Sequence, residues 1–104
     1  MRQIAFKMQL KPGCQAEYKS RHDNLWPQLA TLLGEAGISD YSIFLDEQTL
    51  ALFAVLKLAE PNSLADLPKH PIMRSWCAYM ADIIETNPDH SPKVVDLKQL
   101  FHFA

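Results

Sequence analysis

Alternation of apolar and polar residues predicts the strands of this chain. Positions 2–10 alternate in this way, which is the period of a strand with one buried face, and the Pro-Gly pair at 12–13 ends it. The same period recurs over 39–46. A four-residue turn then leads into the nearly continuous apolar run 50–58, so these two segments are expected to form a hairpin. Over 93–103 the alternation slips, which predicts a last strand with a bulge.

A period of three to four residues predicts the helices. Apolar residues follow this spacing over 14–36, with Pro27 expected to kink or restart the helix and Gly37 to cap it. A second amphipathic stretch covers 72–84. Between the hairpin and this stretch, a proline-punctuated connection is expected to hold one short helical turn over 63–67.

The resulting element order is βαββαβ, which predicts an α+β fold of the ferredoxin-like type. Hairpin pairing and right-handed crossovers place the strands in one antiparallel sheet with both helices on one face. The other face is then uncovered, although the 50–58 strand is apolar on both sides. We therefore expect a homodimer that covers this face, as in the dimeric α+β barrels.

Composition narrows the class of protein. A chain of 104 residues with 48% hydrophobic content is expected to be a single domain over 1–104. Because its net charge is −2 and it has no basic run, we expect neither nucleic acid nor anionic lipid as a partner. It lacks an apolar run of the roughly 20 residues that a membrane span needs, so a cytoplasmic location is expected. Cys14 and Cys77 form no CxxC pair, and the four histidines show no metal-binding spacing.

Tyr18 and His22 are the first candidates for chemistry. They lie one helical turn apart on the apolar face of the first helix, among positions otherwise taken by residues such as Leu25 and Leu29. A buried imidazole or phenol without a hydrogen-bond partner costs roughly 1–3 kcal/mol. The pair therefore indicates either an acid/base pocket or a core histidine whose hydrogen bonds are satisfied.

A wider set of aromatic residues points to a sugar ligand. Aromatic faces pack against the CH patches of a pyranose, while hydroxyl, imidazole and indole groups bond its hydroxyls. The sequence has no GxSxG, P-loop or GxGxxG motif, so hydrolysis, phosphoryl transfer and hydride transfer have no support. The residues that would form such an aromatic wall are Tyr18, His22, Trp26, Tyr41 and Trp76.

These residues resemble those of a known family, the L-rhamnose mutarotases, along essentially the whole chain. The combination of motifs is more specific than any single one. The motifs are A-F-x-M-Q at 5–9, E-Y-x-x-R-H at 17–22, W-P at 26–27, D-Y-S-I-F-L-D at 40–46, R-S-W-C-A-Y-M at 74–80 and N-P-D-x-S-P at 87–92.

The resemblance implies a cytosolic, homodimeric, cofactor-free isomerase that interconverts the α and β anomers of L-rhamnose on a dimeric α+β barrel. By position, it implies that His22 is the proton donor and that Tyr18, Tyr41, Trp76 and Cys77 line the sugar site. His22 would give and retrieve the proton of the ring oxygen by general acid/base catalysis. The family often has two adjacent tryptophans where this chain has Trp76-Cys77. Another 6-deoxy sugar such as L-fucose is therefore an alternative substrate.

Two other classes of protein stay open at this point. One is a cofactor-independent monooxygenase or haem-degrading barrel, in which His22 would serve as an axial ligand. The other is a dimeric binding module without catalysis. For the loop around Asp89 and His90, a solvated turn is favoured over a lid on the pocket. The sequence leaves undecided which group is the general base and whether the last strand pairs within its own subunit.

Overall fold

A computed structural model describes residues 2–104 of the chain. The elements follow the order β-α-α-β-β-η-α-β, where η is a 3₁₀ helix. They are β1 (Arg2–Gln9), α1 (Gln15–Asp23), α2 (Pro27–Glu35), β2 (Ile38–Leu45), β3 (Ala51–Leu58), η1 (Leu64–Lys69), α3 (Pro71–Met80) and β4 (Val95–Leu97).

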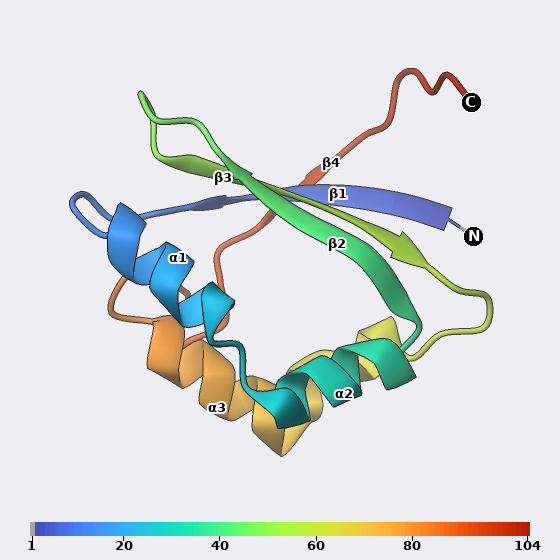
Figure 1. Ribbon diagram of the computed structural model, residues 1–104, viewed down its shortest axis with the longest axis horizontal. Helices are drawn as coiled ribbons and strands as arrows, with labels where there is room; N and C mark the ends of the chain where they lie inside the picture. The colour runs from blue at the N-terminus through green and yellow to red at the C-terminus, as the bar shows by residue number, and fades with distance from the viewer. Residues whose placement is uncertain (1) are drawn as a thin grey trace.

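The four strands form one antiparallel sheet in the order β2-β3-β1-β4. The central pair, β1 and β3, is in register from Arg2 opposite Leu58 to Gln9 opposite Ala51. β2 and β3 are adjacent and antiparallel, which confirms the predicted hairpin. All helices lie on one face of the sheet (Figure 1). This arrangement confirms the ferredoxin-like α+β fold.

The predicted helix over 14–36 is two helices, because Pro27 restarts it. A residue that precedes a proline disfavours helical φ and ψ angles, because the proline ring would clash with it. Trp26 accordingly has φ −59° and ψ 129°, and Pro27 begins α2. α2 ends as expected, with Gly37 at φ +95° donating its N–H to the carbonyl of Gly34. The short break between α1 and α2 redirects the chain along the sheet (Figure 1).

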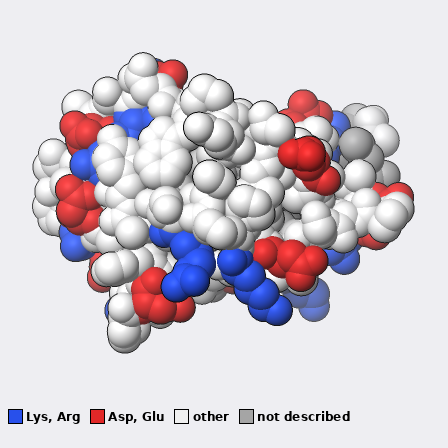
Figure 2. Space-filling model, turned by 90° about the horizontal axis from the view of Figure 1, so that it is seen from below, with Lys and Arg blue, Asp and Glu red and all other residues white. Residues whose placement is uncertain are grey.

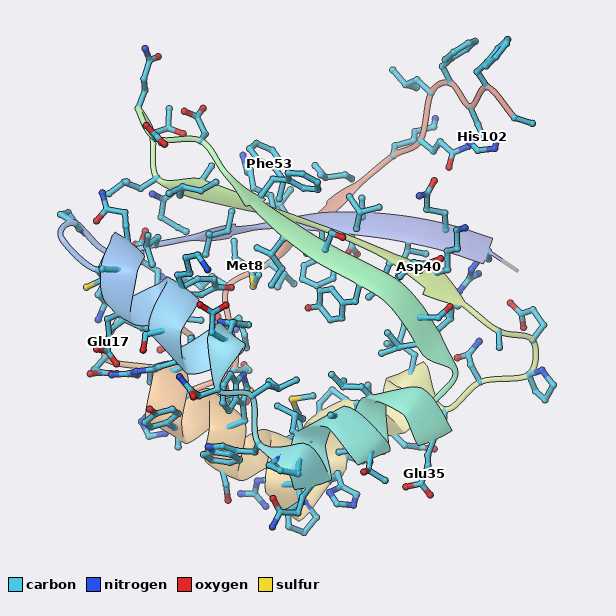
Figure 3. The ribbon with its side chains drawn as sticks, viewed as in Figure 1. Met8, Glu17, Glu35, Asp40, Phe53 and His102 are labelled. Atoms are coloured by element: carbon cyan, nitrogen blue, oxygen red, sulfur yellow. The ribbon has the colours of Figure 1, made fainter. Side chains whose placement is uncertain are left out.

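The core lies between the sheet and the helices. Met8 points toward the helices and Phe53 to the opposite side, as the strand period requires (Figure 3). The buried cluster takes residues from β1, β3 and all three α-helices, or from the positions that directly follow them: Met8, Leu10, Tyr18, Leu29, Leu52, Ala54, Trp76, Met80, Ile83 and Ile84.

The C-terminal third differs from the prediction in two places. The second long helix ends at Met80 rather than at 84, and Ile84 instead forms a β-bridge with Leu10. The expected last strand is present, but its extent of 93–103 and its bulge are wrong: only Val95–Leu97 pairs with β1, and the register irregularity lies in β2, between Ser39 and Ser42. Residues 98–104 leave the sheet and pair with no strand among the described residues, so alternation alone overestimated the strand (Figure 1).

The sheet face away from the helices is apolar and exposed. Phe44 of β2 is 62% exposed, and Val95 and Leu97 of β4 lie on the same face. On the opposite, helical side of the molecule, basic side chains are interspersed with acidic ones (Figure 2). Among residues 2–104, no helix is long and apolar enough to cross a membrane.

Candidate active site

α1 places Tyr18 and His22 on top of one another. They are four residues apart on the helix, and their ring centroids are 4.3 Å apart with the planes tilted by 31°. The Nδ1 atom of His22 lies 3.0 Å from the backbone carbonyl oxygen of Tyr18. Because a carbonyl oxygen only accepts, Nδ1 carries the proton of the neutral ring, and Nε2 is left with a free lone pair.

α3 and the α1–α2 connection complete an aromatic wall around the imidazole. Trp76 stands perpendicular to His22, with 5.5 Å between ring centroids. Trp26 in turn packs edge-on against Trp76 at 5.1 Å and stacks on Tyr79 at 5.6 Å. Tyr79 of α3 belongs to this stack and is 43% exposed. Aromatic packing therefore fixes the plane of the His22 ring.

β2 supplies Tyr41 from the sheet side. Its ring packs edge-on against Phe6 of β1 at 6.5 Å. Burial raises the pKa of the Tyr41 phenol to about 12, with Cys77 contributing, although 39% of the residue is accessible to solvent. Both observations fit a hydroxyl that is surrounded by protein and still reachable by a small molecule. Burial raises the pKa of the Tyr18 phenol, and a smaller charge interaction with the nearby Tyr41 phenol raises it further.

Neither phenol oxygen, of Tyr18 or of Tyr41, hydrogen-bonds another residue in the described range 2–104. With raised pKa values, both phenols keep their protons through the physiological range and can donate to a ligand. For His22 the shift is the opposite: burial lowers its pKa, against smaller raising effects from the Tyr18 carbonyl and Asp23. The site thus holds a neutral base and two phenols at neutral pH.

Cys77 joins this group from α3. Burial, and then the nearby Asp89 carboxylate, raise the pKa of its thiol, so the sulfur is present as an uncharged thiol. Asp89 itself has a lowered pKa because Ser91 donates hydrogen bonds to it from side chain and backbone. Asp89 and His90 are exposed, as expected for a solvated turn, and they border a cleft of about 390 Å³ on the outer side of α3.

The structure thus brings together all five residues predicted for the site: Tyr18, His22, Tyr41, Trp76 and Cys77. Two surface clefts lie elsewhere, one on α3 and one beside the C-terminal segment. We place the site by its chemistry, because neither of those clefts contains an unpaired phenol or the His22 imidazole. Among residues 2–104, no group of three or more His, Cys, Asp or Glu side chains is arranged so that it could bind a metal ion.

Sequence reasoning missed Arg21. It lies outside the apolar stripe of the first helix, yet its side chain is only 10% exposed and is bound by several partners. The available signal was the E-x-x-x-R spacing of Glu17 and Arg21, which favours an ion pair along one helix face. That spacing does not reveal that Tyr79 and Asp82, which come much later in the chain, also bind Arg21.

Comparison with known proteins gives one consistent family. The profile of the family described as L-rhamnose mutarotase matches residues 3–103. A protein named L-rhamnose mutarotase from Sinorhizobium fredii is 57% identical over 104 residues, covering all of both chains. Another of the same name from a Jannaschia species is 57% identical over 102 residues, 98% of each chain.

Solved structures agree with this result. The crystal structure of L-rhamnose mutarotase from Formosa agariphila superposes with a TM-score of 0.94 at 43% identity, covering all of both chains. A protein described as an antibiotic biosynthesis monooxygenase from Bordetella bronchiseptica reaches a TM-score of 0.63 over 95% of this chain and 96% of its own, but at 14% identity this likeness extends to the fold alone. The family profile, the relatives and the solved structure of a family member together show that this chain belongs to the L-rhamnose mutarotase family.

Proposed function

We propose that His22 transfers the protons when this member of the L-rhamnose mutarotase family interconverts the α and β anomers of L-rhamnose. The observation that carries the proposal is the state of His22: neutral, oriented by the Tyr18 carbonyl through Nδ1, and flanked by two phenols without protein partners. An imidazole in this state exchanges protons at a single atom, Nε2.

In the proposed mechanism, Nε2 of His22 first takes the proton of the anomeric hydroxyl. The bond between the anomeric carbon and the ring oxygen breaks as the carbonyl forms, and the ring oxygen receives a proton from the imidazolium. Rotation about the adjacent carbon–carbon bond presents the other face of the carbonyl, and the same steps in reverse close the ring. The hydroxyl and the ring oxygen share one carbon, so one imidazole serves both. The histidine remains the proton donor to the ring oxygen.

The phenols of Tyr18 and Tyr41 are proposed to bind sugar hydroxyls, and Trp76 and Cys77 to line the site. Both phenols stay protonated, so they orient the sugar by donating hydrogen bonds rather than by exchanging protons. General acid/base catalysis contributes typically 10²–10⁴-fold. Such a gain is sufficient for a reaction that already proceeds in water.

We also propose that the protein is a homodimer located in the cytoplasm. Exposed apolar residues on the outer sheet face, with Phe44 62% exposed, support burial against a second copy. The C-terminal Leu100, Phe101 and Phe103 are each at least 80% exposed and extend from the same side of the sheet (Figure 1). Two free thiols, Cys14 and Cys77, support a reducing compartment.

The test is saturation-transfer NMR of anomeric proton exchange on L-rhamnose and L-fucose. Wild type is expected to accelerate exchange on L-rhamnose, and His22→Gln to lose about 10²-fold or more of this acceleration while remaining folded. Gln15→Ala, an exposed substitution at the start of the same helix, serves as the control and should retain activity. Faster exchange on L-fucose would reassign the substrate. Sugar binding without exchange in wild type would favour a binding module, and full activity in His22→Gln would refute the mechanism.

A further inference from the structure

α1 carries two of the proposed site residues but is weakly anchored. Of its nine residues, Tyr18 alone is buried, and its N-terminal end has no side-chain cap. The distance between His22 on α1 and Trp76 on α3 therefore depends on few contacts. A displacement of about 1 Å at a reacting group can reduce a rate by about 10²-fold. Some feature outside the sugar site must hold these two helices in place.

Arg21 makes that connection. Its Nη1 donates to the backbone carbonyl oxygen of Tyr79 at 2.7 Å, near the C-terminal end of α3. Nη1 and Nη2 also bind the two carboxylate oxygens of Asp82, at 2.9 and 3.2 Å, and Nε binds Glu17 on its own helix at 2.7 Å. The guanidinium carbon lies 4.3 Å from the centroid of the Tyr79 ring.

The geometry of these contacts requires a guanidinium. The planar guanidinium of Arg21 contacts two carboxylates, one carbonyl oxygen and one aromatic face. A lysine ammonium cannot make these four contacts together. The two hydrogen bonds to Asp82 strengthen the positive state of Arg21, whose pKa is raised. The ion pair of Lys19 with Asp23 has side chains that are 77% and 60% exposed, and it joins two residues of α1 to each other.

We propose that Arg21 is a positioning residue for catalysis, which ties α1 to the end of α3 and so fixes His22 against Trp76. In this role Arg21 acts through His22 and not on the sugar itself. It precedes the proposed catalytic residue in the chain, and its partners Tyr79 and Asp82 follow Trp76 by three and six positions. The inference rests on the proposed role of His22, so its test includes that residue.

The experiment compares Arg21→Lys and Asp82→Asn with wild type, at a temperature well below the thermal midpoint of every variant. Both variants are expected to lower kcat for anomer exchange by about tenfold or more, with a smaller change in KM, because the imidazole is misplaced while the phenols remain. The NMR signals of the His22 ring are expected to shift in both. Asp82→Glu, which keeps a carboxylate, should recover part of the lost kcat.

Lys19→Ala is the matched control, because it removes an ion pair of α1 that does not reach α3. It should change kcat by less than about twofold. Wild-type kcat in folded Arg21→Lys and Asp82→Asn, even with lowered thermal midpoints, would assign Arg21 to stability alone and overturn the proposal. If Arg21→Lys does not fold, Asp82→Asn still decides, because it leaves Arg21 in place. Full activity of His22→Gln would instead refute the proposed function.

Discussion

At the scale of single residues, burial sorts the titratable groups of the site into two kinds. The phenols of Tyr18 and Tyr41 are pushed away from ionisation, and the imidazole of His22 is pushed toward its neutral form. The same low-dielectric surroundings therefore produce proton-holding donors and a proton-accepting base in one place. Pairs of groups driven apart in this way are a common basis for acid/base chemistry at neutral pH.

The pH dependence of activity follows from the state of His22. Its pKa is lowered below the usual 6.5, so the imidazole is neutral at pH 7 and becomes protonated only as the pH falls through the lowered value. We predict that kcat/KM for anomer exchange is flat above pH 7 and declines toward acid, since a protonated Nε2 cannot accept the anomeric proton. Measurement of kcat/KM against pH reports the free enzyme. A rate that rises toward acid would show that the imidazolium starts the reaction.

The free energy of unfolding is also expected to decrease as the pH falls. The unfolded chain takes up the His22 proton near pH 6.5 and the folded chain only at lower pH, so between these values the unfolded state holds more protons. The contribution of neutral His22 to the free energy of unfolding is therefore fully present above pH 6.5. It decreases as the pH falls through that window.

At the scale of elements, the end of α2 depends on one glycine. Gly37 has φ +95°, where a side chain is strained, and an added Cβ would lie 3.1 Å from the Cβ of Asn62 and 3.3 Å from that of Ala59. We predict that Gly37→Ala lowers the free energy of unfolding by about 1–3 kcal/mol, as measured by urea denaturation.

Gly34 offers the matched control for this prediction. It lies within α2, and an added Cβ there meets no atom within 4 Å. Gly34→Ala should raise the free energy of unfolding by up to about 1 kcal/mol, because alanine is the better helix former. Equal effects of the two substitutions would show that the left-handed conformation of Gly37 is not what limits stability.

The elements that the sequence predicts well are those with a local cause. Pro27 breaks the first helix, Gly37 ends the second, and the hairpin follows from a turn between two strand-like runs. The extent of β4 was not predictable in this way. Apolar residues continue past Leu97 after a slip in the alternation, but a strand exists only where a neighbour pairs with it, and β1 pairs with three residues of β4.

The same distinction applies to the site. Tyr18 and His22 were singled out because their types conflict with an apolar helix face, and Tyr41 and Trp76 as members of an aromatic set. Cys77 came from the family resemblance alone. Arg21 was missed because its strongest partner, Asp82, is 61 positions away in the chain. Helical periodicity describes which way a side chain points, but it does not describe what folds over it.

At the scale of the whole molecule, the outer sheet face determines the expected assembly. Phe44, Val95 and Leu97 are exposed there, whereas the helical side shows mixed charge (Figure 2). We predict that wild type elutes as a dimer in gel filtration with light scattering. Phe44→Asp is expected to shift the mass toward the monomer, because a charge would be buried without a partner at the interface. Gln28→Asp, on exposed α2, should leave the dimer intact. Monomeric wild type would refute the assembly, and the exposed face would then need another explanation.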